Sequence, residues 1–484
     1  MPRPLVMIHG YSSQGTAFES LRNALTSRGV NATDIDICTY VSLNNEITIK
    51  DIAEGLDRAF RNHPVLKRDD LEFDAVVHST GMLVLRSWLT NYGAGPSSNR
   101  RLGRLKHLVG LAPATWGSPQ AHKGRSWLGA LVKGNRELGP DFLNAGDRVL
   151  DGLELGSRLT WELAHLDLLG DEPYYDRGPN TPFVATFIGN QPYQGLASVA
   201  NDPGTDGTVR WAGCSLNTRK LKIDLTRTPI GDDGKPGERL TMLPWADERL
   251  DVPMIAVEGR NHGTLVSDSQ PALVDLITKF LKVGDTGGPT YDSWLAEAKQ
   301  FGEKALQAML VNPGVGTGLT AAAKTFFGHL FDEGHGSTLE GWQQFVVHAR
   351  DERGDGVSDY VIEVLKRNDQ GGWEPFDEMS TDVHAYQADP SFRCFHVRLP
   401  QGLSSGDVQL RVRIHASTGT ELMAYQGYGS EAKQLTATSE PVELDIETKG
   451  QGTLFFPFTT TLIEIVLNRE PLPFDAESRI LQFL

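Results

Sequence analysis

Features that would place this 484-residue chain in a specialised class are scarce or missing. It has no run of about 18 apolar residues, which argues against a membrane-spanning helix. Three cysteines, Cys38, Cys214 and Cys394, lie far apart, match no zinc spacing and cannot build a disulfide framework. The start of the chain has one arginine and an apolar stretch too short for a signal peptide. The sequence therefore predicts a cytoplasmic protein without a signal peptide or transmembrane helix.

Positively charged residues are also fewer than negatively charged ones. The chain has 46 lysines and arginines against 62 aspartates and glutamates, which gives a formal net charge of -16. This balance argues against nucleic acid as a partner and against a basic face held on an anionic bilayer. Hydrophobic residues make up 39%, which leaves ample material for a core. The chain is roughly three times as long as a typical domain of about 150 residues, so we expect it to form two or three domains.

Strand-like and helical segments alternate as far as residue 283. Leu5 to Ile8, Phe73 to Val77 and Leu105 to Leu111 are short apolar strands, and the stretches between such strands have apolar residues at helical spacing. This alternation predicts an α/β fold, a mostly parallel sheet with helices on both faces. Functional loops should lie at the carboxyl ends of the strands. Residues 119–178 form an insertion whose apolar side chains could line an acyl pocket, form a lid or pack as ordinary helices.

The pattern changes after residue 283. A glycine-rich break opens a linker and helical connection that we expect to occupy 284–340. Over 341–484, alternating β segments separated by Gly, Asp and Pro turns predict a β-rich, sandwich-like C-terminal domain, mainly antiparallel. The apolar end of the chain, 480–484, either packs on the edge of this sandwich or contacts a membrane or another subunit. Residues 1–283 would then form the first domain.

The segment Phe73 to Met82 carries the sharpest chemical signal. A strand runs into Ser79, then a small residue and Gly81, and then a helix. A serine on such a tight strand-to-helix turn has its hydroxyl pushed out of the sheet, where it can act as a nucleophile. The usual form of this turn is G-x-S-x-G, and Val77 replaces its first glycine here. The alternative is a serine that only caps the following helix.

Two neighbouring loops would complete a site around this serine. The first strand ends in His9, Gly10 and Tyr11. In a hydrolase site built this way, the N–H groups of Tyr11 and Thr80 would hold the negatively charged oxygen of the intermediate. We expect His9 and Gly10 to contact the substrate, and Trp116, on another strand-end loop, to border the same cleft.

A catalytic serine needs a base, and the base needs a carboxylate to orient it. In this fold the order along the chain is Ser, acid, His. His262 follows a strand and precedes the last helix of the first domain, where the base belongs, whereas His78 should point away from the nucleophile. Asp206, on an Asp-Gly-Thr-Val turn, is the preferred acid, with Asp202 as the alternative. This chemistry requires no metal and no cofactor.

The sequence blocks 78–81, 206–210 and 261–264 together resemble the PlaB-type bacterial phospholipases, in the lipase branch of the α/β-hydrolases. The resemblance implies an N-terminal hydrolase domain and a separate C-terminal domain. It also implies phospholipase A and lysophospholipase A activity, which releases fatty acids from glycerophospholipids, and peripheral association with bacterial membranes. Ser79, His262 and Asp206 would then form the catalytic triad.

Other functions stay open at this point. The same triad would serve a general carboxylesterase or a triacylglycerol lipase, which chain-length and head-group preferences would separate. A catalytically inactive hydrolase fold could instead act as a binding module through its C-terminal domain. The partner that we expect is a phospholipid or lysophospholipid substrate, with a peripheral membrane contact and a homo-oligomer left as options.

Overall fold

The computed structural model covers the whole chain. The residues that it describes are 3–10, 16–40, 44, 46–91, 101–123, 147–170, 174–175, 181–194, 201–227, 239–243, 252–268, 270–311, 339–377, 379, 381–400, 403, 408–426, 442–447, 454–473 and 477–483. They divide into two compact units. The first comprises Met1–Asn217 and Ala246–Gly336, and the second comprises Thr218–Trp245 and Ser337–Leu484.

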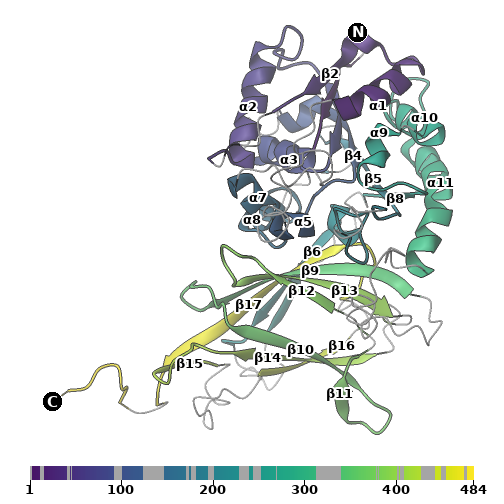
Figure 1. Ribbon diagram of the computed structural model, residues 1–484. Coiled ribbons are helices and arrows are strands. Elements are labelled where there is room, and N and C mark those ends of the chain that lie inside the picture. Colours follow the sequence, from purple (N-terminus) through teal and green to yellow (C-terminus); the bar gives the residue numbers. More distant parts are fainter. Residues whose placement is uncertain are drawn as a thin grey trace. The chain divides into compact units, whose positions relative to one another are not determined.

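The first unit contains a parallel sheet with the strand order β2-β1-β3-β4-β5-β8 (Figure 1). The strands are β1 (Leu5–Ile8), β2 (Ile35–Cys38), β3 (Phe73–His78), β4 (Leu105–Leu111), β5 (Phe183–Gly189) and β8 (Met254–Val257). Every residue of β1 and β3 is buried, as expected for parallel strands covered by helices on both faces. The α/β fold predicted from the sequence is therefore confirmed.

Helices cover both faces of this sheet (Figure 1). Those on one face are α1 (Thr16–Thr26), α9 (Thr264–Ser267), α10 (Pro271–Phe280) and α11 (Tyr291–Val311). Those on the other are α2 (Ile49–Asn62), α3 (Gly81–Asn91), α7 (Asp147–Leu153) and α8 (Arg158–Asp167), and the short α5 (Pro119–Lys123) precedes α7. Within the described residues, no helix is both long enough and apolar enough to span a membrane.

The insertion at 119–178 contributes α5, α7 and α8, while residues 124–146 lie outside the described part of the chain. Helix α8 is tied to α3 by a completely buried ion pair, in which Arg86 Nε and Nη2 lie 2.7 and 2.8 Å from the Asp167 carboxylate. Tyr175 also donates to this carboxylate, at 2.8 Å. Because α3 directly follows Ser79, this network braces the helix behind the expected nucleophile.

The second unit is a β-sandwich. One sheet has the order β12-β13-β9-β17-β6-β7, with β15 paired to β17, and the other has the order β11-β10-β14-β16. The strands are β6 (Thr218–Asp224), β7 (Leu240–Leu243), β9 (Leu339–Asp351), β10 (Tyr360–Arg367), β11 (Trp373–Pro375), β12 (Thr381–Ala385), β13 (Phe392–Pro400), β14 (Gln409–Ala416), β15 (Met423–Gln426), β16 (Val442–Glu447) and β17 (Thr460–Pro471). The predicted sandwich is confirmed, but its larger sheet is mixed because β17 runs parallel to both β6 and β9.

The two units differ from the predicted domains in two places. Residues 218–245 fall inside the predicted first domain, but in the structure they belong to the second unit, because Thr218 on β6 pairs with Thr460 on β17. Local sequence patterns carry no information about a partner strand so distant. In addition, α11 packs on β8 and α10 of the first unit, although the prediction places it in a linker.

The C-terminal segment 477–483 is exposed. Ile480, Leu481 and Phe483 have 55%, 65% and 90% of their surface accessible. The sequence left two options for this segment, and one of them was packing on the sandwich. The exposure of these three side chains does not agree with that option.

Candidate active site

The sheet of the first unit has a topological switch point between β1 and β3. From β1 the chain passes to β2 on one side, and it then returns to β3 on the other side. Connections that diverge in this way leave a crevice at the carboxyl ends of the two strands, where open α/β sheets bind their ligands. Gly10 follows β1 and Ser79 follows β3, so both lie at this crevice.

Ser79 has a backbone conformation that is rare for a residue with a side chain. Its φ angle is 52°, in the left-handed region, which costs an L-residue about 1–3 kcal/mol. The turn is held by hydrogen bonds from Ser79 N–H to the Leu111 carbonyl (3.2 Å) and from Met82 and Ala114 N–H to the Ser79 carbonyl (3.2 and 3.0 Å). Strain held in place at the end of a central strand is typical of a nucleophile turn rather than of a helix cap.

Two glycines allow β1 to approach this turn closely. A Cβ at Gly81 would collide with the carbonyl oxygen of Ile8, and one at Gly10 would lie 2.7 Å from Ser79 Cβ. Val77, which replaces the first glycine of the usual motif, is completely buried in β3. The space requirement of the turn is therefore met by Gly10 and Gly81, and the departure from the motif at Val77 leaves the turn intact.

Asp206 and His262 are joined by a hydrogen bond between the carboxylate Oδ2 and the imidazole Nδ1, at 2.9 Å. The other carboxylate oxygen accepts the N–H groups of Thr208 and Val209, at 3.0 and 2.8 Å. The His262 N–H also donates to the Asp206 carbonyl at 3.1 Å. Asp206 is completely buried and His262 is 5% exposed. This arrangement fixes the ring orientation and leaves Nε2 as the nitrogen that faces away from the carboxylate.

The loop that carries His262 has its own support. Thr264 N–H donates to Asn261 Oδ1, and Asn261 N–H donates to Thr264 Oγ1, both at 2.9 Å. The segment around Asp206 is braced by Tyr193, whose hydroxyl lies 3.0 Å from the Thr208 hydroxyl. These positioning contacts could not be read from the sequence, where the only signal for them is the polar composition of the two loops.

The ring of His78 lies against that of His262, a contact that the sequence did not reveal. Its ring centroid is 4.7 Å from that of His262, and its Nε2 is 3.1 Å from the His262 carbonyl oxygen. Burial, together with the nearby His262 ring, lowers the pKa of His78 well below its usual value. The neutral ring can donate through Nε2 to the His262 carbonyl. This contact links the strand that carries Ser79 to the loop that carries His262.

Other residues expected at the site have different surroundings. Tyr11 lies outside the described residues. Thr80 is completely buried immediately before α3. The ring of His9 is stacked on Tyr40 at 5.1 Å, and the Tyr40 hydroxyl donates to the His9 carbonyl at 3.2 Å. The indole of Trp116 is completely buried and donates to the Ser215 carbonyl at 2.9 Å, so its visible role is to pack the 212–215 turn.

A buried cysteine, Cys214, also lies near Asp206. Burial raises the pKa of the Cys214 thiol well above its usual value, and the negative charge of Asp206 raises it further. The thiol contacts the Arg210 carbonyl at 3.6 Å. A protonated, buried thiol of this kind is an apolar packing group rather than a nucleophile.

No protein-family model matches the chain, and no curated protein is similar to it in sequence. Among solved structures, phospholipase PlaB from Legionella pneumophila in complex with thio-NAD is 19% identical with a TM-score of 0.73, and the alignment covers 100% of this chain and 97% of that one. A second structure of the same phospholipase is 20% identical with a TM-score of 0.72 and the same coverage. The mature lipase BlEst2 from Bacillus licheniformis is 13% identical, covers 57% of this chain and 92% of its own, and has a TM-score of 0.37. The resemblance noted from the sequence blocks therefore holds at the level of the fold, and the chain is an α/β-hydrolase-fold protein that shares the architecture of Legionella PlaB over its whole length.

Proposed function

We propose that the protein is a serine lipolytic hydrolase that releases fatty acids from glycerophospholipids and lysophospholipids. The observation that carries the proposal is the combination of a strained serine at the switch point with a buried carboxylate–imidazole pair, whose imidazole ring centroid is 4.7 Å from that of His78, the residue before Ser79. Ser79 has a φ of 52°, and Asp206 Oδ2 lies 2.9 Å from His262 Nδ1. A packing role for these residues would require neither the strain at Ser79 nor the oriented imidazole.

In the proposed mechanism, Ser79 Oγ attacks the ester carbonyl while His262 Nε2 removes its proton. Asp206 stabilises the imidazolium that forms, because its carboxylate faces Nδ1–H. The N–H groups of Thr80 and Tyr11 would hold the oxyanion, and removal of one such donor typically costs about 10²–10³ in rate. His262 then protonates the leaving alcohol. Water attacks the acyl-enzyme by the same route in reverse and releases the fatty acid.

The choice of a phospholipid substrate has narrower support. It rests on the three sequence blocks that resemble the PlaB-type phospholipases and on the architectural likeness to Legionella PlaB across both units. A peripheral contact with a lipid surface belongs to the same proposal. With a net charge of -16, such a contact would use apolar side chains or a local patch rather than the overall charge.

The test is fatty acid release by the full chain from a diacylphosphatidylglycerol, a lysophosphatidylcholine, a triacylglycerol and a short p-nitrophenyl ester. Ser79→Ala is the diagnostic variant, and we expect it to lower turnover by about 10⁴–10⁶. Ser87→Ala is the matched control, because Ser87 is another buried serine of the same region, on α3. It should keep wild-type activity.

Release from both phospholipids, lost in Ser79→Ala and kept in Ser87→Ala, would support the full proposal. If only the short ester is hydrolysed, Ser79 remains the proposed nucleophile, but the protein would be a general esterase rather than a phospholipase. Retention of a tenth of the activity by Ser79→Ala would overturn the nucleophile assignment.

A further inference from the structure

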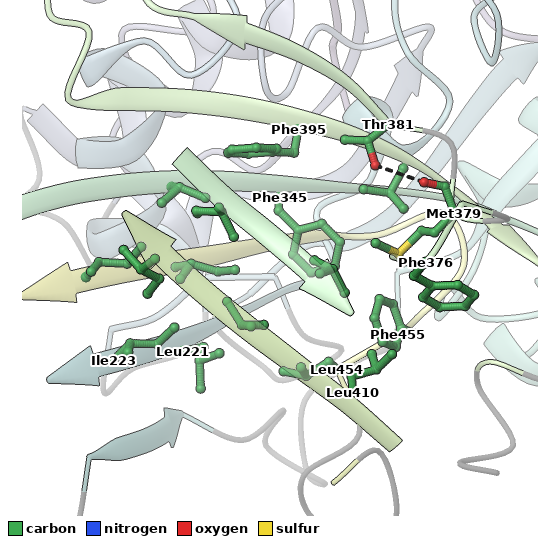
Figure 2. Close-up of a pocket in the computed structure, with 18 of the residues that line it drawn as sticks. Leu221, Ile223, Phe345, Phe376, Met379, Thr381, Phe395, Leu410, Leu454 and Phe455 are labelled. Atoms are coloured by element: carbon green, nitrogen blue, oxygen red, sulfur yellow. Dashed lines mark hydrogen bonds between the residues drawn. The ribbon is translucent and has the colours of Figure 1, made fainter. Parts of the chain in front are cut away.

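The sandwich of the second unit encloses an apolar cavity of about 270 Å³ between its two sheets. Side chains from both sheets line it, and Figure 2 shows them converging on the same space. They include Phe345 and Ile465 of the larger sheet and Val364 and Val412 of the smaller one. Protein interiors normally leave few voids larger than a water molecule. This cavity is near the lower end of the range of about 300–1,000 Å³ that small-molecule ligands occupy.

The chemistry of the lining selects an alkyl chain. Of its nineteen residues, only Thr381 carries a polar side-chain group, and that hydroxyl already donates to the Met379 carbonyl at 3.3 Å (Figure 2). A polar ligand would therefore lose its hydrogen bonds to water without replacement. A flexible hydrocarbon would gain dispersion contacts with lining atoms that otherwise have no partner on one side.

One wall of the cavity is formed by the connection from β11 to β12 and by the start of β12. Phe376 and Met379, on this connection, and Thr381, the first residue of β12, line the cavity. Val383, on β12, also lines it although 49% of its surface is exposed. Because β11 and β12 are edge strands of the two sheets and Val383 is half exposed, we infer that a ligand would enter along this edge of the sandwich.

A lysine, Lys366, lies on the inner face of the sandwich at this edge. Lys366 is two residues beyond Val364 on β10, so it leaves the strand on the cavity side, and its direct partner on β14 is the cavity-lining Leu410. Its Nζ is 5.7 Å from the centre of the Phe376 ring and 3.6 Å from Glu374 Oε1. Glu374 is on edge strand β11 and is 44% exposed, so its carboxylate can turn to water when another anion approaches.

We propose that the second unit is a binding site for an unesterified fatty acid, with the alkyl chain between the sheets and the carboxylate beside Lys366. The cavity accounts for the chain, and the ammonium at the open edge accounts for the anionic head. The site lies within the second unit alone and does not depend on hydrolysis at Ser79. A fatty acid is also the product that the proposed activity would release, which makes product sensing through this unit a consequence if both proposals hold.

The experiment is calorimetric titration of the full-length protein with dodecanoate, decanoate and 1-dodecanol, each below its solubility limit. We expect one dodecanoate per chain. Each methylene that enters the cavity should tighten binding about fourfold, so dodecanoate should bind about 15-fold more tightly than decanoate.

Val364→Phe fills the cavity and should abolish binding. Val361→Phe, the same substitution three residues earlier on the outer, 54% exposed side of β10, should leave binding unchanged. Thermal unfolding of both variants establishes that they are folded.

Lys366→Ala tests the head group, and the uncharged alcohol reports any effect that the shorter side chain has on the packing around Phe376. It should weaken dodecanoate up to about fivefold, as for a partly exposed ion pair, and leave 1-dodecanol unchanged. Arg367→Ala removes a neighbouring charge on the outer face and should affect neither ligand.

The proposal is supported if dodecanoate binds saturably to the wild type and if Val364→Phe or Lys366→Ala weakens that binding as stated. Absence of saturable binding to the folded wild type, or equal loss of the acid and the alcohol in Lys366→Ala, would overturn it. Since no turnover is measured, the result is separate from the test of Ser79.

Discussion

Replacing Asp206 with asparagine changes one carboxylate oxygen into an amide nitrogen and leaves the shape of the side chain almost unaltered. One carboxylate oxygen accepts two backbone N–H groups, from Thr208 and Val209 at 3.0 and 2.8 Å. The other lies 2.9 Å from His262 Nδ1. An asparagine would keep its oxygen on the two N–H donors, because an NH₂ group cannot accept from them. Its NH₂ group would then face His262.

An NH₂ donor at this place makes Nδ1 of the neutral imidazole the acceptor and puts the ring proton on Nε2. That nitrogen can no longer take the proton of Ser79. The wrong tautomer costs about 10⁴ in turnover in a Ser-His-Asp triad, which corresponds to about 5.4 kcal/mol of transition-state stabilisation. We therefore expect a fall of about 10⁴ in kcat for Asp206→Asn, with the fold preserved.

The assay is steady-state hydrolysis of a p-nitrophenyl ester, with thermal unfolding measured in parallel. Asp202→Asn is the matched control, since it makes the same change four residues away, at a residue whose backbone carbonyl accepts a hydrogen bond from the Thr205 hydroxyl. It should stay within about twofold of wild type. More than a tenth of the activity in folded Asp206→Asn, or an equal loss in Asp202→Asn, would refute the reasoning.

The remaining predictions concern His78 and the buried Arg86–Asp167 pair. His78→Ala should lower kcat by about 10- to 100-fold by misplacing the His262 loop, whereas His78→Gln, which keeps an N–H donor, should retain most of the activity; equal losses would argue against a positioning role. In the unfolded chain the pKa of His78 is near 6.5, whereas in the folded chain it is lowered. Below about pH 6.5, His78 is therefore protonated in the unfolded chain but stays neutral in the folded one. Its contribution to stability is therefore complete above that pH and lost as the pH falls below it, by up to about 1.4 kcal/mol per pH unit, so urea midpoints between about pH 7 and 5 should fall more steeply for wild type than for His78→Gln. Arg86→Met should reduce the free energy of unfolding by about 3–5 kcal/mol because it leaves Asp167 charged and buried, and Arg86→Met with Asp167→Leu should recover most of the loss; a double variant as unstable as the single one would contradict this cause.

Much of the candidate site could be predicted because its signals are local. A strand, a small residue and Gly81 around Ser79 describe a turn whose geometry depends on neighbours in sequence, and the structure has the strained φ of 52° there. The position of His262 after a strand could likewise be predicted from apolar periodicity. The orientation of His78 could not, because it depends on a carbonyl 184 residues further along the chain.

The sequence by itself determined the alternation of strands and helices, the turn at Ser79 and the β-rich character of the second half, because each follows from residues close together in the chain. Only the tertiary structure decided that Asp206 lies against His262, and that β6 leaves the first unit to pair with β17. It alone also decided that the apolar faces of two sheets leave a cavity of about 270 Å³ beside Lys366. A period-two pattern shows which side chains face inward but not which strand they meet, or how completely the two layers fill the space between them.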